Sequence, residues 1–502
     1  MNKNKTYGVI GVCGANGNLI TRILSQRGYG VVASDTSSKK DCRFARSLDG
    51  YDIEVFYGET PQTFFDMSDY IIPPLSLSDE SDIIKNSQKP VLKLPQVLDE
   101  IKPDKPVFGI TGTNGKTTST TLLKKIASDN AIKTCEHGLE GMQGNAEYIP
   151  ILQSRLEGDV AVLEVGTFGV PGSVARIVKN TDMSAGLILN ITPDHLGEPG
   201  GFMDYAHVKG EFISEIGEGK LIVNGQDPTV MGLLRENDFK GEVITFGVDE
   251  VPDSVGVKEC VCGREISVKE IISGCGYYFC RCGLTTPQTD YIATNVNLKK
   301  RTFDLYTPDE KLSVKMGING LHNVYNITGV IIAAHEFLGL SYDRILPSVE
   351  AFTGVSGRME EVGNVRGRDI YVDYAHNPAG VETLLKEFKK LFGDFTCVIT
   401  VSSESGYKGD VEIFDSAVRF SKFIVPASEA SRKIAAQRLC ENPELDDRIF
   451  MGHGSDFEKT GTLGASEDEV REGIKKALDL DCDVVIAVGE AATRYKSVVF
   501  DL

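Results

Sequence analysis

Short apolar runs alternate with amphipathic stretches along most of the chain, and this alternation predicts β-strands joined by α-helices in a mostly parallel sheet. Near the start, Tyr7–Cys13 has the pattern of a buried strand, Leu19–Arg27 that of a helix and Gly30–Asp35 that of a second strand. These segments form a βαβ opening. Apolar strand candidates of the same kind recur at Val107–Ile110, Val160–Glu164, Gly186–Asn190, Lys220–Asn224, Ile370–Asp373, Thr396–Val401, Phe423–Pro426 and Asp483–Val488.

Breaks in this pattern divide the chain into three predicted domains. Three prolines and several charges between Pro95 and Pro106 are typical of a linker, and a glycine-containing stretch precedes the third group of strands. A cysteine-rich stretch at about 256–290 interrupts the second group and is predicted to be an insertion. The predicted domains comprise residues 1–103, 104–355 and 356–502.

The strongest chemical motif has a strand before it and a helix-like run after it. The sequence is Gly109-Ile-Thr-Gly-Thr-Asn-Gly-Lys-Thr-Thr118. Glycines let backbone N–H groups converge on phosphate oxygens at a helix N-terminus. Lys116 adds a full positive charge, and the Thr117 hydroxyl can ligate Mg²⁺. We therefore predict an ATP-binding loop made of Gly112, Thr113, Asn114, Gly115, Lys116, Thr117 and Thr118.

Composition narrows the possible functions. Asp and Glu number 72 against 53 Lys and Arg, so the 502-residue chain has a net charge of −19. This balance argues against a nucleic-acid partner, because phosphate contacts along a duplex need a basic face. The chain contains no apolar run of about 18 residues, as a transmembrane helix would need, and its polar start does not resemble a signal peptide. We expect a cytoplasmic protein without a membrane partner, and the odd number of scattered cysteines, 11, argues against a disulfide framework.

Five of the cysteines crowd into residues 260–282. Cys260-Val-Cys262-Gly and Cys280-Arg-Cys282-Gly are near copies, and two such turns can present four thiolates to one tetrahedral Zn²⁺. We predict a structural zinc site at Cys260, Cys262, Cys280 and Cys282. The C-x-C spacing is tighter than the usual C-x-x-C, so Cys275 is an alternative ligand. Free thiols, a redox pair and an iron–sulfur cluster are alternative interpretations.

Several short motifs, in one order along the chain, resemble the Mur ligase superfamily of ATP-dependent enzymes that form amide bonds in cell-wall peptide synthesis. These motifs are Thr111–Thr118, Leu163–Val165, Leu189–Leu196, Tyr205–Lys209, Gly320–Asn326, Gly357–Glu360 and Asp373–Pro378. The resemblance implies three α/β domains: a Rossmann-like N-terminal domain, a central P-loop ATPase domain with an inserted zinc ribbon, and a Rossmann-like C-terminal domain. It also implies a reaction in which ATP phosphorylates a carboxylate and an amine then displaces the phosphate.

The same resemblance implies roles for individual residues. The implied catalytic residues are Lys116, Glu164, His195 and Lys209, and the implied Mg²⁺ ligands are Thr117, Glu164 and His195. Lys209 would be carbamylated, because a free ammonium group would repel the cation. Surface roles for Glu164 and Lys209 are the alternatives.

Nucleotide contacts are implied for a second group of residues. Asn323 and Asn326 lie three positions apart, so on a helix both can reach one base edge. Arg358, Asp373 and His376 follow in the third predicted domain. Helix capping by Asn323 and loop orientation by His376 are the alternatives.

A weaker motif lies at the N-terminus, where Gly11, Gly14 and Gly17 separate a strand from a helix and Asp35 ends the next strand. The arrangement is similar to a dinucleotide fingerprint, although the spacing is not G-x-G-x-x-G. The family resemblance implies that this loop binds the uridine diphosphate part of a substrate, through Gly14, Ala15, Asn16, Gly17 and Asp35.

The sequence thus favours a complete ligase that joins an amino acid to a carboxylate of a UDP-linked peptide or similar precursor. The third domain lacks the Asp-Asn-Pro-Arg motif of ligases that add diaminopimelate. The cysteine-rich insertion resembles the zinc ribbon of the ligase-like subunit in the lipid II amidating complex. A zinc-ribbon ligase with a Rossmann-like first domain suggests the archaeal relatives that build pseudomurein peptides, and murein precursor synthesis is the alternative.

Other interpretations stay open. They are a ligase-like subunit of a glutamine-dependent amidotransferase, an amide ligase for a folate or tetrapyrrole coenzyme, and a non-catalytic nucleotide-binding protein. A monomer is expected unless an amidotransferase partner exists.

Overall fold

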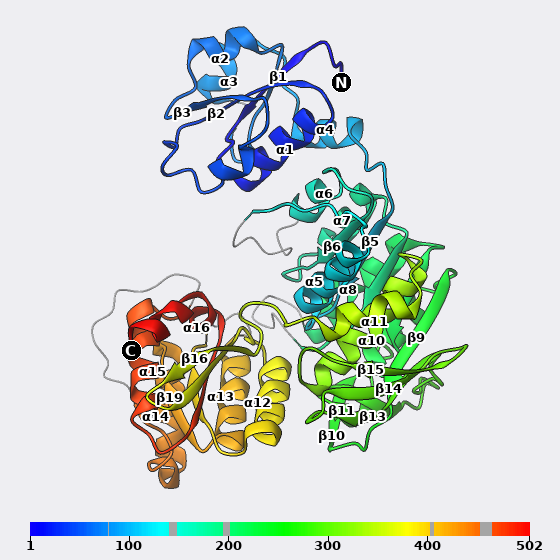
Figure 1. Cartoon of the computed structure of the whole chain (residues 1–502), viewed down its shortest axis with the longest axis vertical. Coiled ribbons are helices and arrows are strands. Elements are labelled where there is room, and N and C mark those ends of the chain that lie inside the picture. Colours follow the sequence, from blue (N-terminus) through cyan, green and yellow to red (C-terminus); the bar gives the residue numbers. More distant parts are fainter. Residues whose placement is uncertain (79, 140–147, 194–200, 402–405, 452–463) are drawn as a thin grey trace.

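The computed structural model describes residues 1–502 except 79, 140–147, 194–200, 402–405 and 452–463. The chain forms three lobes in sequence order, and each lobe is built on its own sheet (Figure 1). The predicted α/β class with three domains is confirmed. Among the described helices, none combines the length and the apolar character that crossing a membrane requires.

The first lobe is a parallel four-stranded sheet with the order β3-β2-β1-β4. Its strands are β1 (Thr6–Ile10), β2 (Gly30–Asp35), β3 (Glu54–Tyr57) and β4 (Tyr70–Ile72). Its helices are α1 (Ala15–Gln26), α2 (Gln62–Met67), α3 (Asp82–Ser87) and α4 (Leu94–Glu100). The predicted βαβ opening corresponds to β1, α1 and β2, with α1 starting earlier than the apolar run indicated.

The central lobe contains an eight-stranded sheet with the order β15-β14-β13-β9-β8-β7-β5-β6. Its strands are β5 (Val107–Thr111), β6 (Ala161–Val165), β7 (Ala185–Ile188), β8 (Lys220–Asn224), β9 (Glu242–Val248), β13 (Tyr291–Asn297), β14 (Thr302–Tyr306) and β15 (Lys311–Lys315). The pairs from β6 to β13 are parallel, whereas β14 and β15 are added antiparallel at one edge. This antiparallel edge is not apparent from the apolar runs.

Helices cover both faces of this sheet, because its strands are apolar on both sides. One buried cluster joins the sheet to α5 (Lys116–Asp129), α10 (Leu321–Glu336) and α11 (Tyr342–Glu350). A second cluster joins it to α6 (Tyr148–Gln153), α7 (Ser173–Thr181), α8 (Phe202–Ile216) and α9 (Pro228–Glu236). The second cluster continues into α1 and α4, so the first lobe packs on this face.

The predicted insertion forms a separate antiparallel sheet between β9 and β13 in the sequence. Its strands are β10 (Ser254–Glu259), β11 (Glu265–Ile272) and β12 (Cys275–Phe279). We call this sheet, with the two cysteine-containing turns that follow β10 and β12, the ribbon.

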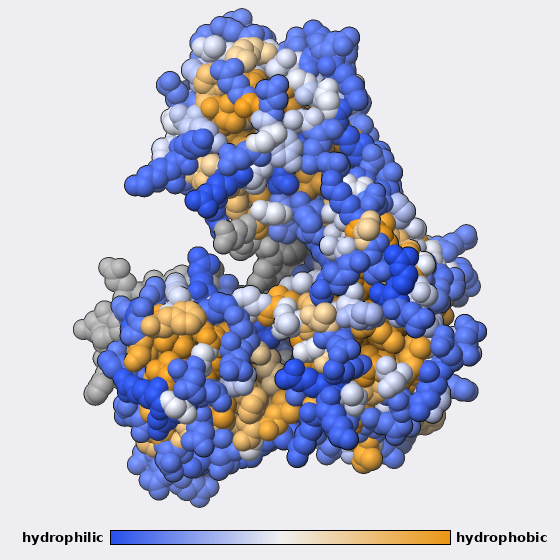
Figure 2. Space-filling model, in the orientation of Figure 1, coloured by the Kyte–Doolittle hydropathy of each residue, from blue (hydrophilic) through white to orange (hydrophobic). Residues whose placement is uncertain are grey.

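The third lobe is a five-stranded sheet with the order β16-β17-β20-β18-β19, in which only the β16–β17 pair is antiparallel. Its strands are β16 (Glu360–Val365), β17 (Arg368–Asp373), β18 (Thr396–Ile399), β19 (Phe423–Pro426) and β20 (Val484–Val488). Its helices are α12 (Pro378–Phe392), α13 (Gly406–Phe420), α14 (Glu429–Glu441), α15 (Glu467–Leu478) and α16 (Glu490–Arg494). Figure 2 shows a wide notch in the outline of the molecule, between the first lobe and the third.

One disulfide departs from the sequence-based expectation. Cys13 and Cys42 are bonded, with their Cα atoms 5.0 Å apart. An odd number of scattered cysteines argues against a disulfide framework but leaves room for one bridge. The two cysteines belong to loops that follow β1 and β2, and the parallel register of these strands brings the loops together.

Arg155 joins the linker to the central lobe. Its side chain is 1% exposed and donates to the carbonyl oxygens of Ile101, Ile151 and Leu98 at 2.6, 2.6 and 3.3 Å. Burial lowers the pKa of the guanidinium to about 10, so the group stays charged at neutral pH. Several buried carbonyl groups therefore depend on one side chain.

We expect Arg155→Met to lower the free energy of unfolding by about 2–4 kcal/mol, because it fills the space but leaves buried carbonyl oxygens without donors. Arg419→Met is the matched control, since Arg419 is exposed and pairs with exposed Glu382 at 2.7 Å. It should change stability by less than about 1 kcal/mol. Urea midpoints of the parent and both variants provide the measurement, and equal shifts for the two variants would contradict the assignment.

Candidate active site

The phosphate loop connects β5 to α5, as the sequence predicts. Gly112 and Gly115 have φ values of +153° and +88°. A Cβ atom on Gly115 would lie 2.3 Å from Oδ1 of Asn326, so the loop lies directly against α10. Glycine is therefore required at Gly115 for both its backbone conformation and its packing.

A second segment, Asn190–Thr192, holds the loop in shape. Asn190 Oδ1 accepts from the Asn114 backbone N–H at 2.9 Å, and Asn190 Nδ2 donates to the Asn114 carbonyl at 2.9 Å. Thr113 N–H donates to the Asn190 carbonyl at 2.8 Å, and its hydroxyl lies 3.0 Å from the Thr192 nitrogen. The phosphate loop and this segment form one hydrogen-bonded unit.

Two predicted Mg²⁺ ligands come together beside the loop. The Thr117 hydroxyl donates to Glu164 Oε1 at 3.3 Å. Glu164 reaches this point because Ile110 and Glu164 are in register on neighbouring parallel strands. Hard oxygen atoms of these two kinds suit Mg²⁺. His195 lies outside the described residues.

Lys116 and Lys209 occupy different surroundings. Lys116 Nζ donates to the Thr113 carbonyl at 2.9 Å, so it folds back over its own loop. Lys209, on α8, is 2% exposed, and its Nζ lies 5.2 Å from the centre of the Tyr205 ring. The Tyr205 hydroxyl is in turn 3.4 Å from the Thr113 hydroxyl. This burial rules out a solvent-exposed role for Lys209.

Asn323 and Asn326 lie on one face of α10, as their spacing predicts, and both are buried. Asn326 Nδ2 donates to Asn323 Oδ1 at 3.0 Å, and Asn323 Nδ2 donates to the Asn319 carbonyl at 2.6 Å. Asn326 therefore packs against the phosphate loop at Gly115, and Asn323 holds the Asn326 side chain in place.

The third-lobe residues gather where β17 ends. Asp373 accepts from the backbone N–H groups of Met359 at 2.6 Å and Ala375 at 2.7 Å. Burial raises the pKa of the Asp373 carboxyl, although Arg358 and these two N–H groups act against the rise. The Arg358 guanidinium stacks 4.4 Å from the centre of the Tyr374 ring, and His376 Nδ1 lies 3.2 Å from the Tyr374 carbonyl oxygen.

The third lobe touches the phosphate loop itself. Asn377 Nδ2 donates to Asn114 Oδ1 at 3.1 Å, and Asn114 Nδ2 lies 3.4 Å from Asn377 Oδ1. Asn114 of the predicted ATP-binding loop therefore contacts the residue that follows His376, a predicted nucleotide contact of the third lobe. Sequence reasoning did not single out Asn377, although it lies within the Asp373–Pro378 motif.

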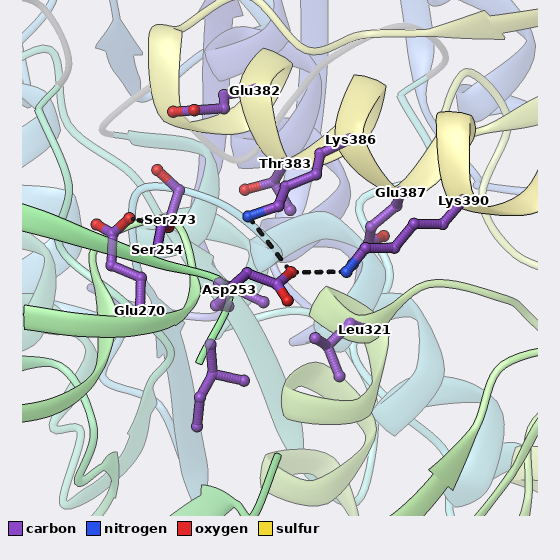
Figure 3. A pocket seen from close by; sticks show the side chains of 12 residues that line it. Asp253, Ser254, Glu270, Ser273, Leu321, Glu382, Thr383, Lys386, Glu387 and Lys390 are labelled. Atoms are coloured by element: carbon purple, nitrogen blue, oxygen red, sulfur yellow. Dashed lines mark hydrogen bonds and ion pairs between the residues drawn. The ribbon is translucent and has the colours of Figure 1, made fainter. Parts of the chain in front are cut away.

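Three ionic contacts support this arrangement of lobes. Asp253, just before β10, accepts from Lys390 at 2.6 Å and lies 3.4 Å from Lys386, both on α12 (Figure 3). His322 Nδ1 lies 2.6 Å from Glu387 Oε2. Burial alone would lower the pKa of His322, but the Glu387 carboxylate outweighs it and raises the pKa.

The N-terminal glycine loop is tightly built. A Cβ atom on Gly17 would lie 2.2 Å from the Gly11 carbonyl oxygen, and Gly14 is the N-cap of α1. Ala15 and Asn16 open that helix. Asp35 is buried and accepts from the N–H groups of Cys13 at 2.9 Å and Ser37 at 2.8 Å. Asp35 thus fixes Cys13, the residue that precedes Gly14 at the start of α1.

The four predicted zinc ligands converge. The sulfur atoms of Cys260, Cys262, Cys280 and Cys282 all lie within 4.8 Å of one another. Arg235 donates to the Cys282 sulfur at 3.1 Å and lowers the pKa of this thiol to about 6, which favours the thiolate that a metal binds. Cys275 lies apart, 3.7 Å from Asp227 Oδ2, so the structure does not place it among these four sulfur atoms.

Comparison with known proteins identifies the family. Residues 110–334 match the Mur ligase middle domain, and residues 357–490 match the Mur ligase, glutamate ligase domain. The solved pseudomurein peptide ligase type C from Methanothermus fervidus is 33% identical, with a TM-score of 0.85 over 99% of this chain and 100% of that chain.

More distant relatives belong to the same family of ligases. A UDP-N-acetylmuramoyl-L-alanyl-D-glutamate–2,6-diaminopimelate ligase from Halalkalibacterium halodurans is 23% identical, covering 84% of this chain and 81% of that protein. The structure of the MurF ligase from Thermotoga maritima in complex with ADP shares the fold, with 16% identity and a TM-score of 0.59 over 96% of this chain and 97% of that chain. The chain therefore belongs to the Mur ligase family and is an ATP-dependent acid–amino-acid ligase of the kind that builds cell-wall precursors.

Proposed function

We propose that this ligase adds an amino acid to a carboxylate of a UDP-linked peptide precursor of pseudomurein, in the cytoplasm. The observation that carries the chemistry is that Glu164 of β6 meets Thr117 beside the phosphate loop, over which Lys116 folds, and that this loop also contacts Asn377 of the third lobe. The similarity to a pseudomurein peptide ligase over almost the whole chain supports the choice of pathway.

A carboxylate and an amine do not condense spontaneously in water, so the carboxylate must first be activated. The substrate carboxylate attacks the γ-phosphorus of ATP, ADP leaves, and an acyl phosphate forms. The acceptor amine then attacks the acyl carbon, and phosphate departs from the tetrahedral intermediate with a proton lost from nitrogen. The protein contributes alignment and neutralisation of charge rather than covalent help.

Each candidate residue has a role in this scheme. The backbone N–H groups at the N-terminus of α5 and the Lys116 ammonium hold the phosphates, which requires Lys116 to leave the Thr113 carbonyl. Thr117, Glu164 and His195 would hold Mg²⁺, which neutralises charge between the phosphates and the carboxylate. Asn323 and Asn326 are proposed on the adenine side, and Arg358, Asp373 and His376 on the ribose and phosphate side.

Lys209 fits a carbamate better than a free ammonium group. It is buried beside Tyr205, whose hydroxyl reaches the phosphate loop. A buried ammonium near a bound cation is unfavourable, whereas reaction with CO₂ gives an anionic group on the same side chain.

The UDP part of the substrate is assigned to Gly14, Ala15, Asn16, Gly17 and Asp35 on the first lobe.

Phosphate release in the presence of UDP-linked peptides, with each amino acid in turn as acceptor, tests the proposed function. We expect release to depend on both a UDP-linked peptide and one amino acid or a small set of them. Lys116→Ala is the inactive reference and should be at least about a thousandfold slower. If ammonium ions outcompete every amino acid, the proposal is contradicted and the amidotransferase alternative is favoured. If phosphate release instead depends on a folate or tetrapyrrole acid, the coenzyme alternative is favoured.

Lys209→Ala should reduce turnover at least about a hundredfold, because the anionic group facing the metal is lost. Formate or acetate should restore part of the rate by occupying the vacated position, measured as carboxylate-dependent phosphate release. Lys179→Ala, at an exposed helical lysine, is the control and should gain nothing from these ions. Normal turnover in Lys209→Ala would refute the assignment.

One zinc ion per chain is expected by elemental analysis of protein purified without chelators. Cys280→Ser should lose most of it, because three thiolates and a hydroxyl bind zinc more weakly than four thiolates. Cys275→Ser is the matched control, since Cys275 is buried in the same ribbon but lies outside the four-sulfur cluster. Zinc lost in the control but kept in Cys280→Ser, or iron in the parent, would overturn the ligand set.

A further inference from the structure

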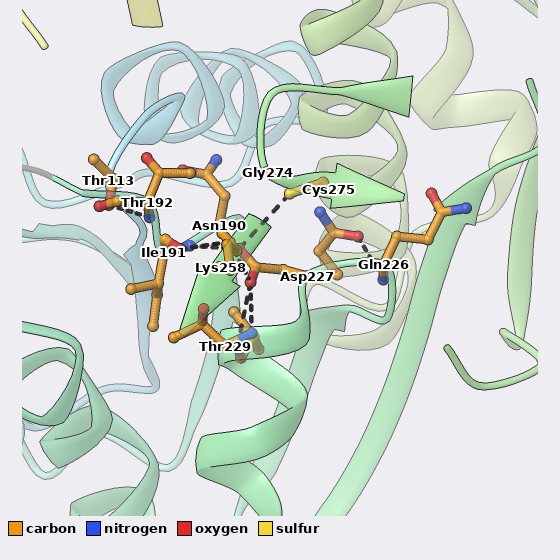
Figure 4. Close-up of polar contacts among 12 residues, drawn as sticks. Thr113, Asn190, Ile191, Thr192, Gln226, Asp227, Thr229, Lys258, Gly274 and Cys275 are labelled. Carbon is orange, nitrogen blue, oxygen red and sulfur yellow. Dashed lines mark hydrogen bonds and ion pairs between the residues drawn. The ribbon is translucent and has the colours of Figure 1, made fainter. Parts of the chain in front are cut away.

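A lysine of the ribbon reaches into the core of the central lobe. Lys258, on β10, is buried, with a side chain only 6% exposed. Its Nζ donates to the Ile191 carbonyl oxygen at 3.0 Å and to Asp227 Oδ1 at 3.1 Å (Figure 4). Burying a lysine needs both a counter-ion and hydrogen bonds, and these two contacts supply them.

Asp227 is the centre of this buried cluster. Its side chain is fully buried, and Oδ1 caps α9 by accepting from Thr229 N–H at 2.8 Å. Oδ2 accepts from the Ile191 N–H at 2.7 Å and from the Cys275 thiol at 3.7 Å. Both polar groups of the Ile191 backbone are therefore held from one side, the N–H by Asp227 and the carbonyl by Lys258.

The residues flanking Ile191 hold the phosphate loop. Asn190 brackets Asn114 through two hydrogen bonds of 2.9 Å, and Thr192 exchanges hydrogen bonds with the Thr113 hydroxyl. A continuous path of hydrogen bonds thus runs from the ribbon, through Lys258 and residues 190–192, to the loop proposed to bind ATP.

We propose that Lys258 is a positioning residue of the ligase reaction: from the ribbon, it sets the position of the phosphate loop through Ile191. The proposal rests on the proposed function for its kinetic consequences but not for its structural ones. The ribbon is then an active part of the ATP site rather than an appended module. A neutral residue at this position would leave the Asp227 carboxylate buried without its cation, and the Ile191 peptide could shift.

The size of the effect follows from the demands of in-line phosphoryl transfer. Displacing a positioned group by about one ångström can cost about a hundredfold in rate. We therefore expect Lys258→Met to lower kcat about 10–100-fold. The KM for the acceptor amino acid should change less than about threefold, because the hydrogen bonds of Lys258 to described residues lead to the phosphate loop.

Two controls separate positioning from stability. Lys269→Met makes the same substitution at an exposed lysine on β11 of the ribbon and should leave kcat within about twofold. Arg155→Met removes a buried cation that does not contact residues 190–192, so it lowers stability without touching this path. All variants are assayed well below their unfolding midpoints.

Hydrogen exchange of the ligand-free protein gives a readout independent of activity. Backbone amides of residues 109–118 should exchange at least about fivefold faster in Lys258→Met than in the parent. In Lys269→Met, their exchange rates should equal those of the parent. If the parent shows no ligase activity, the proposed function fails and exchange alone decides the positioning role. If Lys258→Met does not fold, Lys258→Gln, which keeps a donor without the charge, decides by the same two readouts.

A kcat within twofold of the parent, together with unchanged exchange at residues 109–118, would overturn the proposal. So would an equal fall in kcat for Arg155→Met, since lost stability would then account for the effect. A fall in kcat confined to Lys258 variants, with faster exchange of the phosphate loop, supports it.

Discussion

The first turn of α5 must keep its backbone N–H groups for phosphate, so the loop before it needs support from other segments, and this constraint governs the architecture around it. In this protein the segment Asn190–Thr192 provides the missing support, since it pairs with Thr113 and Asn114 through both side chains and backbone. Asn326 closes the loop from the side of α10, where it fills the space next to Gly115. These contacts fix the shape of the loop, which matches the need for preorganised charge stabilisation.

That dependence extends outward to parts of the chain far apart in sequence. The support segment is held by Asp227 and Lys258, and Lys258 belongs to the ribbon. Just before β10, where the ribbon begins, Asp253 binds two lysines of the third lobe. The ribbon and the residue just before it therefore contact both the segment that supports the phosphate loop and the third lobe, although the ribbon is an insertion in the sequence and contributes none of the predicted ATP-binding residues.

The sequence predicted the elements that repeat a strong local pattern. The apolar strands, the glycine-rich loop between β5 and α5, and the paired cysteine turns all depend on residues within a few positions of each other. The meeting of Thr117 with Glu164 also follows, because neighbouring parallel strands bring their carboxyl ends to one edge. β14 and β15 were missed because short strands with alternate burial carry a weaker signal than the continuous apolar runs of the inner sheet.

Long-range pairs could not be predicted in this way. Lys258 lies in a strand whose alternation reads as half solvent-exposed, and it is buried only because the ribbon packs against Asp227, 31 positions away in the chain. His322 and Glu387 are separated by 65 positions and belong to different lobes. The bridge between Cys13 and Cys42 likewise depends on two loops meeting in space. Such pairs are set by tertiary packing, which local periodicity does not encode.

The contacts along α12 have a geometric consequence. Asn377, immediately before this helix, bonds to Asn114, and Lys390 near its other end bonds to Asp253. At about 1.5 Å of rise per residue, these two anchor points lie about 20 Å apart on one stiff rod. Two fixed points define a line, so the third lobe keeps one rotational degree of freedom out of three while both contacts hold. Any swing in another direction must first release one end of the rod.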